Sequence, residues 1–283
     1  MKKNKKKLLK QLIEKAEDMP PLPKVAHRAL RLLSKSNFNM QELASILSTD
    51  QALTGQLLHW ANSSYYGLRN PVSTINQAVV YLGEMTVRSL VLTASLANYM
   101  YRSVPGYHLD RGELWKHSLG IAVSAKLVSK RFGENISEES YTAGLLCDIG
   151  KLVFDVALRD FKPTDPEWQK RPFSELETNH FGINHAVLGA RIGKHWGFPP
   201  ELLEAISHHH HPSKADKDAI SPSAVHVGDV LVSILGIGIG RDGLQYKLDK
   251  FALKRLGIEE TDFEDLLLQV TALIKDVETI INP

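Results

Sequence analysis

The stretch SEESYTAGLLCDIGKLVFDVAL, residues 137–158, decides the fold class of this chain. Its apolar residues recur at the spacing of an α-helix, and the same period continues in nearly every other segment. Strict alternation of apolar and polar residues, which is typical of half-buried strands, is essentially missing. The sequence therefore predicts an all-α protein built as a multi-helix bundle.

Helical spacing extends to both sides of this stretch. The helical pattern breaks at RSVPGYHLD, residues 102–110, which is the best candidate for a domain or subdomain boundary. We therefore expect a basic N-terminal helix over residues 1–18 and two helical subdomains over residues 19–105 and 106–283. The second subdomain holds the quoted stretch and the segments LDRGELWKHSLGIAVSAKLVSKRFG, NHAVLGARIGKHWG, PPELLEAISHHHH and SPSAVHVGDVLVSIL.

Composition narrows the class of protein. The chain has 283 residues, 43% of them hydrophobic and 23% charged, which suffices for a sizeable buried core. A net charge of +2 argues against nucleic acid as an obligate partner, and MKKNKKK is interpreted as a solvated terminus. No segment approaches the roughly 20 apolar residues of a membrane span. One cysteine fits a reducing compartment, so we expect a cytoplasmic protein without a membrane partner.

Two shorter patterns receive structural interpretations. GIGIGRDG, residues 236–243, is rich in glycine, but it comes after a segment with helical spacing and not after a strand, and it lacks a Lys-Ser/Thr pair. It is therefore interpreted as a flexible connection and not as a phosphate-binding loop. Ser174, with Glu177 three residues later, predicts the capped start of a short helix.

The second half carries polar residues that could converge inside a bundle. Glu113 and His117 are four residues apart and share a helix face. Asp148 and Asp229 lie among apolar residues, where a carboxylate is costly unless it is paired or bound to metal. Helical bundles build metal sites from such inward-facing groups. The candidate ligands are Glu113, His117, Cys147, Asp148, His185, His209, His210 and Asp229.

Simpler explanations exist for each of these residues. A single histidine is more often a surface or core residue than a ligand, and Cys147 alone is typical of a small buried hydrophobe. The run HHHH, residues 208–211, cannot bind one ion through all four side chains, because consecutive helical positions point in different directions. The cation beside Asp148 could also be Lys151.

The order His117, then Cys147-Asp148-Ile149-Gly150-Lys151, then Asp229 resembles the HD superfamily of metal-dependent phosphohydrolases. The signature of that superfamily is H…HD…D, with HDIGK a frequent form. The segment GINHAVLGARIGKHWGFPPELLEAISHHHHP resembles a part of the HD-GYP and HDOD branches that carries one histidine and then a pair. That pair stands two residues before proline, which selects His209 and His210.

The first half resembles the HDOD family, the HD-related output domain of bacterial signalling proteins. The resemblance rests on DQALTGQLLHWANSSYYG, residues 50–67, and INQAVVYLG, residues 75–83, and it extends from about residue 19 to about residue 240. Residues 19–105 would then be the N-terminal HDOD subdomain and residues 106–283 an HD-like subdomain with the metal site.

Two departures from the superfamily matter. The DGxGYP segment of HD-GYP phosphodiesterases is absent, so cyclic-di-GMP hydrolysis is not implied. Cys147 stands where the signature has a metal-binding histidine. Thiolate also binds zinc or iron, so this change leaves metal binding open.

Three functions follow from the resemblance. We expect a regulatory signalling protein, and not an efficient enzyme, whose degenerate site still binds divalent Fe, Zn or Mn, with two ions as one option. The first alternative is a metal-dependent phosphohydrolase acting on a nucleotide or another phosphoester, in which Asp148 and Asp229 hold the metal and Lys151 stabilises phosphoryl charge. The second is an interaction scaffold without metal. No organic cofactor is implied, and the expected partner is a protein of a signalling pathway.

Overall fold

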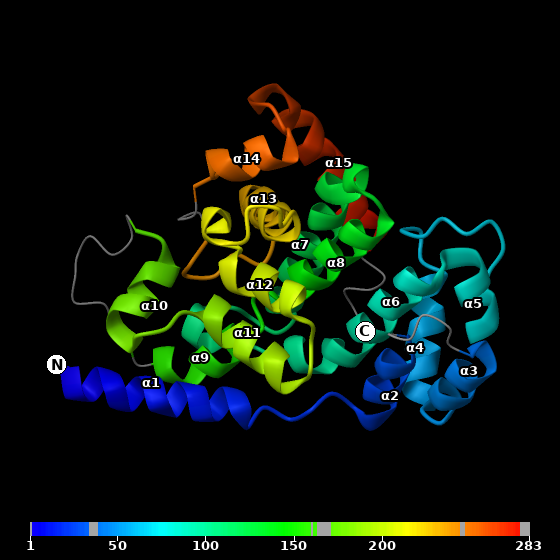
Figure 1. Ribbon diagram of the computed structural model, residues 1–283, viewed down its shortest axis with the longest axis horizontal. Helices are drawn as coiled ribbons and strands as arrows, with labels where there is room; N and C mark the ends of the chain where they lie inside the picture. Colours follow the sequence, from blue (N-terminus) through cyan, green and yellow to red (C-terminus); the bar gives the residue numbers. More distant parts are fainter. Residues whose placement is uncertain (1, 34–38, 160, 163–170, 244–246, 278–283) are drawn as a thin grey trace. The chain divides into compact units, whose positions relative to one another are not determined.

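The computed structural model describes residues 2–33, 39–159, 161–162, 171–243 and 247–277. Helices account for the regular structure of these residues, which contain no strand beyond an isolated bridge between Val104 and Leu109. The prediction of an all-α protein is confirmed (Figure 1).

In the first half of the chain, the helices are α1 (Lys2–Glu17), α2 (Lys24–Leu33), α3 (Met40–Ser48), α4 (Gln51–Ala61), α5 (Ile75–Leu82) and α6 (Glu84–Met100). In the second half, they are α7 (Glu113–Ser129), α8 (Glu134–Leu146), α9 (Lys151–Leu158), α10 (Phe173–Phe181), α11 (His185–His195), α12 (Pro200–His208), α13 (Ser221–Ile234), α14 (Lys250–Leu256) and α15 (Phe263–Asp276). The short 3₁₀ helices are η1 (Pro105–Tyr107), η2 (Lys130–Phe132), η4 (Pro212–Lys214) and η5 (Glu260–Asp262).

The chain forms two compact units. Unit 1 comprises Met1–Pro20 and Met100–Thr271, and unit 2 comprises Pro21–Tyr99 and Ala272–Pro283. Helix α1 therefore belongs to the same unit as α7–α14, which the sequence alone did not indicate.

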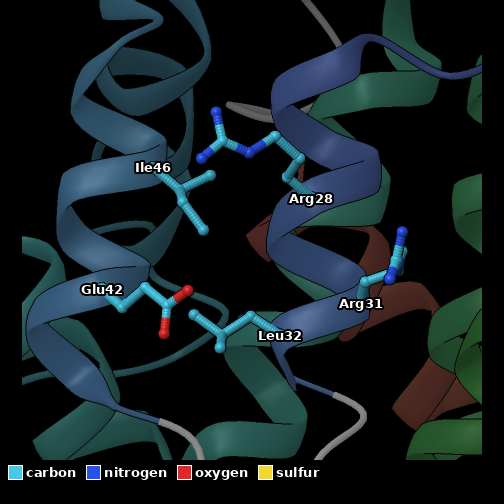
Figure 2. A pocket seen from close by; sticks show the side chains of 5 residues that line it. All are labelled: Arg28, Arg31, Leu32, Glu42 and Ile46. Carbon is cyan, nitrogen blue, oxygen red and sulfur yellow. The ribbon is translucent and has the colours of Figure 1, made fainter.

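Unit 2 is organised by capped helices around a small core. Asn39 caps α3 by accepting from the backbone N–H of Gln41 at 2.8 Å, and Asp50 caps α4 in the same way. The Asn62 side chain both accepts from and donates to the backbone of Val72. A pocket of about 240 Å³ opens between α2 and α3 and is lined by Arg28, Arg31, Leu32, Glu42 and Ile46 (Figure 2).

Unit 1 is built around α7, which packs against both α8 and α13 (Figure 1). Helix α7 is buried along most of its length, with Trp115 and Leu119 fully buried. Helix α11 packs on α12, and α1 packs along α11. This arrangement directs one residue or pair from each of several helices toward a common interior.

Within the described residues, every helix is too short or too polar to cross a lipid bilayer.

Candidate metal centre

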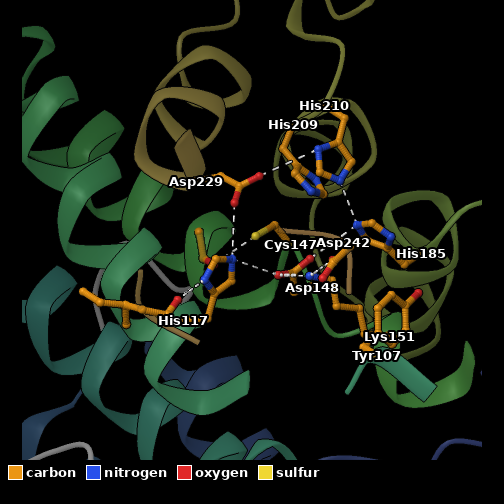
Figure 3. A network of polar contacts seen from close by, with 12 residues as sticks. Tyr107, His117, Cys147, Asp148, Lys151, His185, His209, His210, Asp229 and Asp242 are labelled. Carbon is orange, nitrogen blue, oxygen red and sulfur yellow. Dashed lines mark hydrogen bonds and ion pairs between the residues drawn. The ribbon is translucent and has the colours of Figure 1, made fainter. Parts of the chain in front are cut away.

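Polar side chains from several elements of unit 1 meet in its interior (Figure 3). Helix α7 contributes His117, the turn between α8 and α9 contributes Cys147 and Asp148, and α13 contributes Asp229. None of the labelled side chains is more than 9% exposed. We call this set the polar centre: Tyr107, His117, Cys147, Asp148, Lys151, His185, His209, His210, Asp229 and Asp242.

His117 is held from behind by a backbone carbonyl. Its Nδ1 lies 2.8 Å from the carbonyl oxygen of Ile237, and its Nε2 lies 3.2 Å from Oδ1 of Asp229 and 3.6 Å from Oδ2 of Asp148. The approach of Ile237 depends on Gly238, where φ is +56° and an added Cβ would lie 2.3 Å from the Glu113 carbonyl oxygen. Burial is the largest single effect and disfavours the charged imidazole, but the hydrogen bond to Asp229 and the negative charges of Asp148 and Asp229 together raise the pKa of His117.

His185 is held by a carboxylate. Its Nδ1 lies 2.8 Å from Oε2 of Glu177, which also accepts from the His185 backbone N–H at 2.8 Å. The first turn of α11 reaches this position because it packs directly on Gly150, where an added Cβ would lie 2.0 Å from the His185 carbonyl oxygen. Burial opposes the charged imidazole, yet the negative charge on Glu177 raises the pKa of His185.

His209 and His210 follow α12 and face the other imidazoles. His209 Nδ1 lies 2.7 Å from the carbonyl oxygen of Ile206, so Nδ1 carries the proton and donates it. Its buried Nε2 has no hydrogen-bond partner among the described residues. His210 Nε2 lies 2.8 Å from His185 Nε2 and His210 Nδ1 lies 3.8 Å from Oδ2 of Asp229. Burial lowers the pKa of His209 to about 4, and the pKa of His210 is also lowered.

His117, His185 and His209 share one geometry. In each ring, Nδ1 contacts an acceptor outside the centre, and Nε2 points inward. An outer acceptor of this kind is what fixes the tautomer and orientation of metal-binding histidines. Three imidazole lone pairs are therefore directed at one interior region, provided that the rings are deprotonated.

Asp148 joins the two sides of the polar centre. Its Oδ1 lies 3.4 Å from His185 Nε2, and its Oδ2 lies 2.9 Å from Lys151 Nζ. Lys151 Nζ also lies 2.6 Å from Oδ2 of Asp242. Burial disfavours each charge, but Lys151 lowers the pKa of Asp148, and Asp148 with Asp242 raises the pKa of Lys151. The lysine is thus a buried ammonium held between two carboxylates. Lys151 therefore is a cation beside Asp148, as the sequence analysis allowed.

Cys147 is fully buried and donates to the carbonyl oxygen of Gly144, with an Sγ–O distance of 3.2 Å. Burial and the nearby charge of Asp148 raise the pKa of the Cys147 thiol well above its usual value. At neutral pH, Cys147 is therefore a neutral thiol and not a thiolate.

The polar centre carries excess negative charge. The three carboxylates of the centre, of Asp148, Asp229 and Asp242, and the adjoining carboxylate of Glu177 outnumber its one lysine, Lys151. Burial is the largest single effect and favours the neutral acid, but the hydrogen bond from His117 and the charges of nearby imidazoles together lower the pKa of Asp229. Such buried anions require protons on the imidazoles or a bound cation to balance them.

The donor atoms fit a divalent ion. Ligand atoms of His185, His209 and His210 lie within 4.8 Å of one another, and so do ligand atoms of Cys147, Asp148 and His209. His209, whose Nε2 has no hydrogen-bond partner among the described residues, belongs to both groups. Imidazole with carboxylate is a donor set that suits Fe, Zn or Mn.

Seven of the eight candidate ligands lie in the polar centre, whereas Glu113 does not. The Glu113 carboxylate is half-buried and pairs with Lys116 at 3.4 Å, so the shared helix face with His117 does not bring it to the centre. The outer two histidines of the HHHH run also point elsewhere. His208 and His211 line a groove of about 640 Å³ with Arg191 and Lys214.

Three functional residues escaped the sequence analysis: Tyr107, Glu177 and Asp242. Glu177 does not cap α10, because Pro172 is the residue before that helix and Ser174 lies within it. Asp242 lies in GIGIGRDG, which is not a loose connection in its described part. Arg241 N–H donates to the Tyr107 carbonyl oxygen at 2.7 Å, and the loop also supplies the Ile237 carbonyl to His117. A glycine-rich segment carries no periodicity, so no pattern in the sequence signals these contacts.

The chain is similar in sequence to a protein family and to a protein from another organism. The HDOD domain family model matches residues 19–212. An uncharacterized protein from Treponema pallidum (strain Nichols) is 24% identical over 216 residues, which are 75% of this chain, and the chain covers 41% of that relative's length.

Solved structures share the fold. An HDOD domain protein of unknown function from Geobacter sulfurreducens has a TM-score of 0.75 at 24% identity, with 99% of both chains covered. A protein from Shewanella amazonensis SB2B that is provisionally named a phosphohydrolase has a TM-score of 0.71 at 22% identity, with 96% of this chain and 97% of that chain covered.

Proposed function

Because this chain belongs to the HDOD family, we propose that it is a regulatory protein whose polar centre binds a divalent metal ion as a structural or sensing element. The observation that carries this proposal is the shared geometry of His117, His185 and His209, each anchored at Nδ1 with Nε2 turned inward.

His185, His209 and His210 would hold such an ion, with Asp148 as the carboxylate ligand. Asp148 also faces His117, which stands beside Asp229, so a second ion would find its ligands on that side. The ion would supply the positive charge that balances the buried carboxylates. Iron, zinc and manganese are the metals that the donor set favours.

Burial favours regulation over catalysis. Each residue of the polar centre is at most 9% exposed, so Asp148 and Lys151 offer little surface to a phosphoester in this conformation. Without metal, Cys147 is a protonated thiol at the position where the signature has a histidine, so an ion would have to displace the thiol proton to gain a ligand there. We propose that the protein acts through a protein partner in a signalling pathway.

Hydrolysis is the second candidate, and one observation favours it. The buried ammonium of Lys151 lies 2.9 Å from Asp148, where it could stabilise charge on a phosphoryl oxygen. Screening of phosphoesters and nucleotides tests this function. Turnover that Asp229→Ala abolishes would replace the regulatory proposal by a phosphohydrolase.

Elemental analysis of the full chain, purified without a histidine tag, tests metal binding. The proposal predicts one or two equivalents of Fe, Zn or Mn per chain, strongly reduced by Asp148→Ala. His208→Ala is the matched control, because this histidine lies outside the polar centre and its loss should leave the metal content unchanged. A wild-type protein without metal after purification and reconstitution would refute the proposal.

A further inference from the structure

Glu177 is a fully buried carboxylate whose hydrogen-bond donors, among the described residues, belong to Tyr107 and His185. Its Oε2 accepts from the backbone N–H of His185 and lies 2.8 Å from His185 Nδ1. Its Oε1 accepts from the hydroxyl of Tyr107 and lies 3.0 Å from the same Nδ1. Tyr107, Glu177 and His185 are each 0% exposed.

A buried carboxylate is costly unless donors and a counter-charge satisfy it. The three donors of Glu177 come from Tyr107 and His185. Lys151 is paired instead with Asp148 and Asp242. Glu177 therefore has the His185 imidazole as its partner, whereas Asp148 and Asp242 are paired with Lys151.

The anchor of His185 also differs from the anchors of the other two imidazoles. His117 and His209 donate from Nδ1 to neutral backbone carbonyls, of Ile237 and Ile206. His185 donates to a charged carboxylate, which forms a stronger hydrogen bond and raises the basicity of the opposite ring nitrogen. That nitrogen, Nε2, lies 2.8 Å from His210 Nε2 and 3.4 Å from Asp148.

We propose that Glu177, itself held by Tyr107, is the positioning residue that makes His185 the strongest imidazole ligand of the polar centre. Its carboxylate fixes the proton on Nδ1, so that Nε2 presents a lone pair toward His209 and His210. This inference rests on the proposed function, because it assigns roles around the metal ion.

The backbone around Tyr107 explains why its hydroxyl reaches Glu177. Gly106 N–H donates to Oδ1 of Asp155 at 2.7 Å, and an added Cβ at Gly106 would lie 2.3 Å from the Asp155 carbonyl oxygen. The Tyr107 ring packs edge-on against Phe173, with ring centroids 5.6 Å apart. Tyr107 is therefore fixed at both its backbone and its ring, and its hydroxyl is a rigid support for the carboxylate.

Glu177→Gln separates charge from shape, because glutamine keeps the size and an acceptor oxygen. We expect it to weaken Zn²⁺ binding, measured by competition with a chromophoric chelator, by about 10- to 100-fold. Tyr107→Phe retains the carboxylate and should weaken binding less. Glu175→Gln, an exposed change on the same helix, should leave the affinity unchanged.

A second control separates positioning from loss of packing. Phe173→Leu loosens the core around Tyr107 but leaves the hydrogen bonds of Glu177 in place. It should lower the melting temperature with little effect on Zn²⁺ affinity. A Glu177→Gln protein that binds Zn²⁺ as tightly as wild type would overturn the inference.

Nitrogen-15 NMR of metal-free wild-type protein gives an independent readout. When neutral, His185 should carry its proton on Nδ1, and a proton on Nε2 would overturn the inference even if Glu177→Gln failed to fold. Failure of the proposed function and failure of this inference give different results. A wild-type chain that binds no Zn²⁺ refutes the proposed function, whereas the tautomer of His185 in metal-free protein tests the role of Glu177.

Discussion

Oδ2 of Asp242 lies 2.6 Å from Nζ of Lys151, and both side chains are buried. This ion pair connects the glycine-rich loop after α13 to the first residue of α9. It places the ammonium beside Asp148, so the loop takes part in the charge balance of the polar centre.

Asp242→Asn should destabilise the protein, because Lys151 would keep only Asp148 as a charged partner. We expect the free energy of unfolding to fall by about 1 to 3 kcal/mol, measured by urea denaturation with an unchanged m-value. Asp218→Asn is the control, since Asp218 is 81% exposed and pairs with Arg255 at 3.7 Å. Equal effects of the two substitutions would contradict a structural role for the buried pair.

Gly238→Ala should disturb the anchor of His117, whereas Gly236→Ala should not. Both glycines have positive φ, so alanine is strained at either position, by about 1 kcal/mol. Only at Gly238 would the added Cβ also strike the Glu113 carbonyl and the His117 Cβ, at 2.3 and 2.8 Å. Gly238→Ala should therefore cost more stability and also weaken metal binding. Matching losses of metal affinity in the two variants would argue against the Ile237 anchor.

The pH dependence of stability should reveal the imidazole charges. The raised pKa values of His117 and His185 contribute stability below the ordinary value of 6.5, and this is lost as the pH rises through the folded-state pKa values. The melting temperature of metal-free protein should therefore fall on the alkaline side. Added Zn²⁺ should reverse the fall, because metal binds the deprotonated rings.

His117→Gln should flatten this alkaline fall, whereas His195→Gln, an exposed change on α11, should leave it intact. On the acid side the sign is opposite. The lowered pKa values of Asp148 and Asp229 give stability above 3.8 that is lost as the pH falls. Melting temperatures of metal-free protein that climb steadily through the alkaline range would contradict the assignment.

Cys147→Ala should leave metal binding nearly intact, because the buried thiol is protonated and already donates to the Gly144 carbonyl oxygen. The native protein should also resist thiol-specific alkylation until it is unfolded. Substitution by Co²⁺ gives the sharpest measurement. A thiolate-to-cobalt charge-transfer band that disappears in Cys147→Ala would show that the metal removes the thiol proton and that Cys147 is a ligand.

The helical fold followed directly from the sequence, because apolar periodicity reports which faces are buried. Residues such as Asp148 and Asp229 stood out because ionised groups are unexpected within apolar runs. Their convergence could be expected from the order of the motifs. Helical spacing alone misplaced Glu113, since a shared helix face does not determine where a flexible side chain ends.

Glu177 and Asp242 were missed for different physical reasons. Glu177 fits a capping pattern by its spacing from Ser174, and only tertiary packing brings it to His185. Asp242 follows glycines whose backbone conformations have no periodic signal, and its partner Lys151 lies 91 residues earlier in the sequence. Contacts that depend on loop paths are determined by the three-dimensional packing and not by local pattern.

Anomalous X-ray scattering from crystals grown with Zn²⁺ shows directly whether the polar centre binds the ion. Data collected above and below the zinc absorption edge locate the ion without assumptions about its ligands. We predict a peak at bonding distance, about 2.0 to 2.1 Å, from Nε2 of His185 and Nε2 of His209. A peak found only beside the outward-facing His208 and His211, or no peak at all, would contradict it.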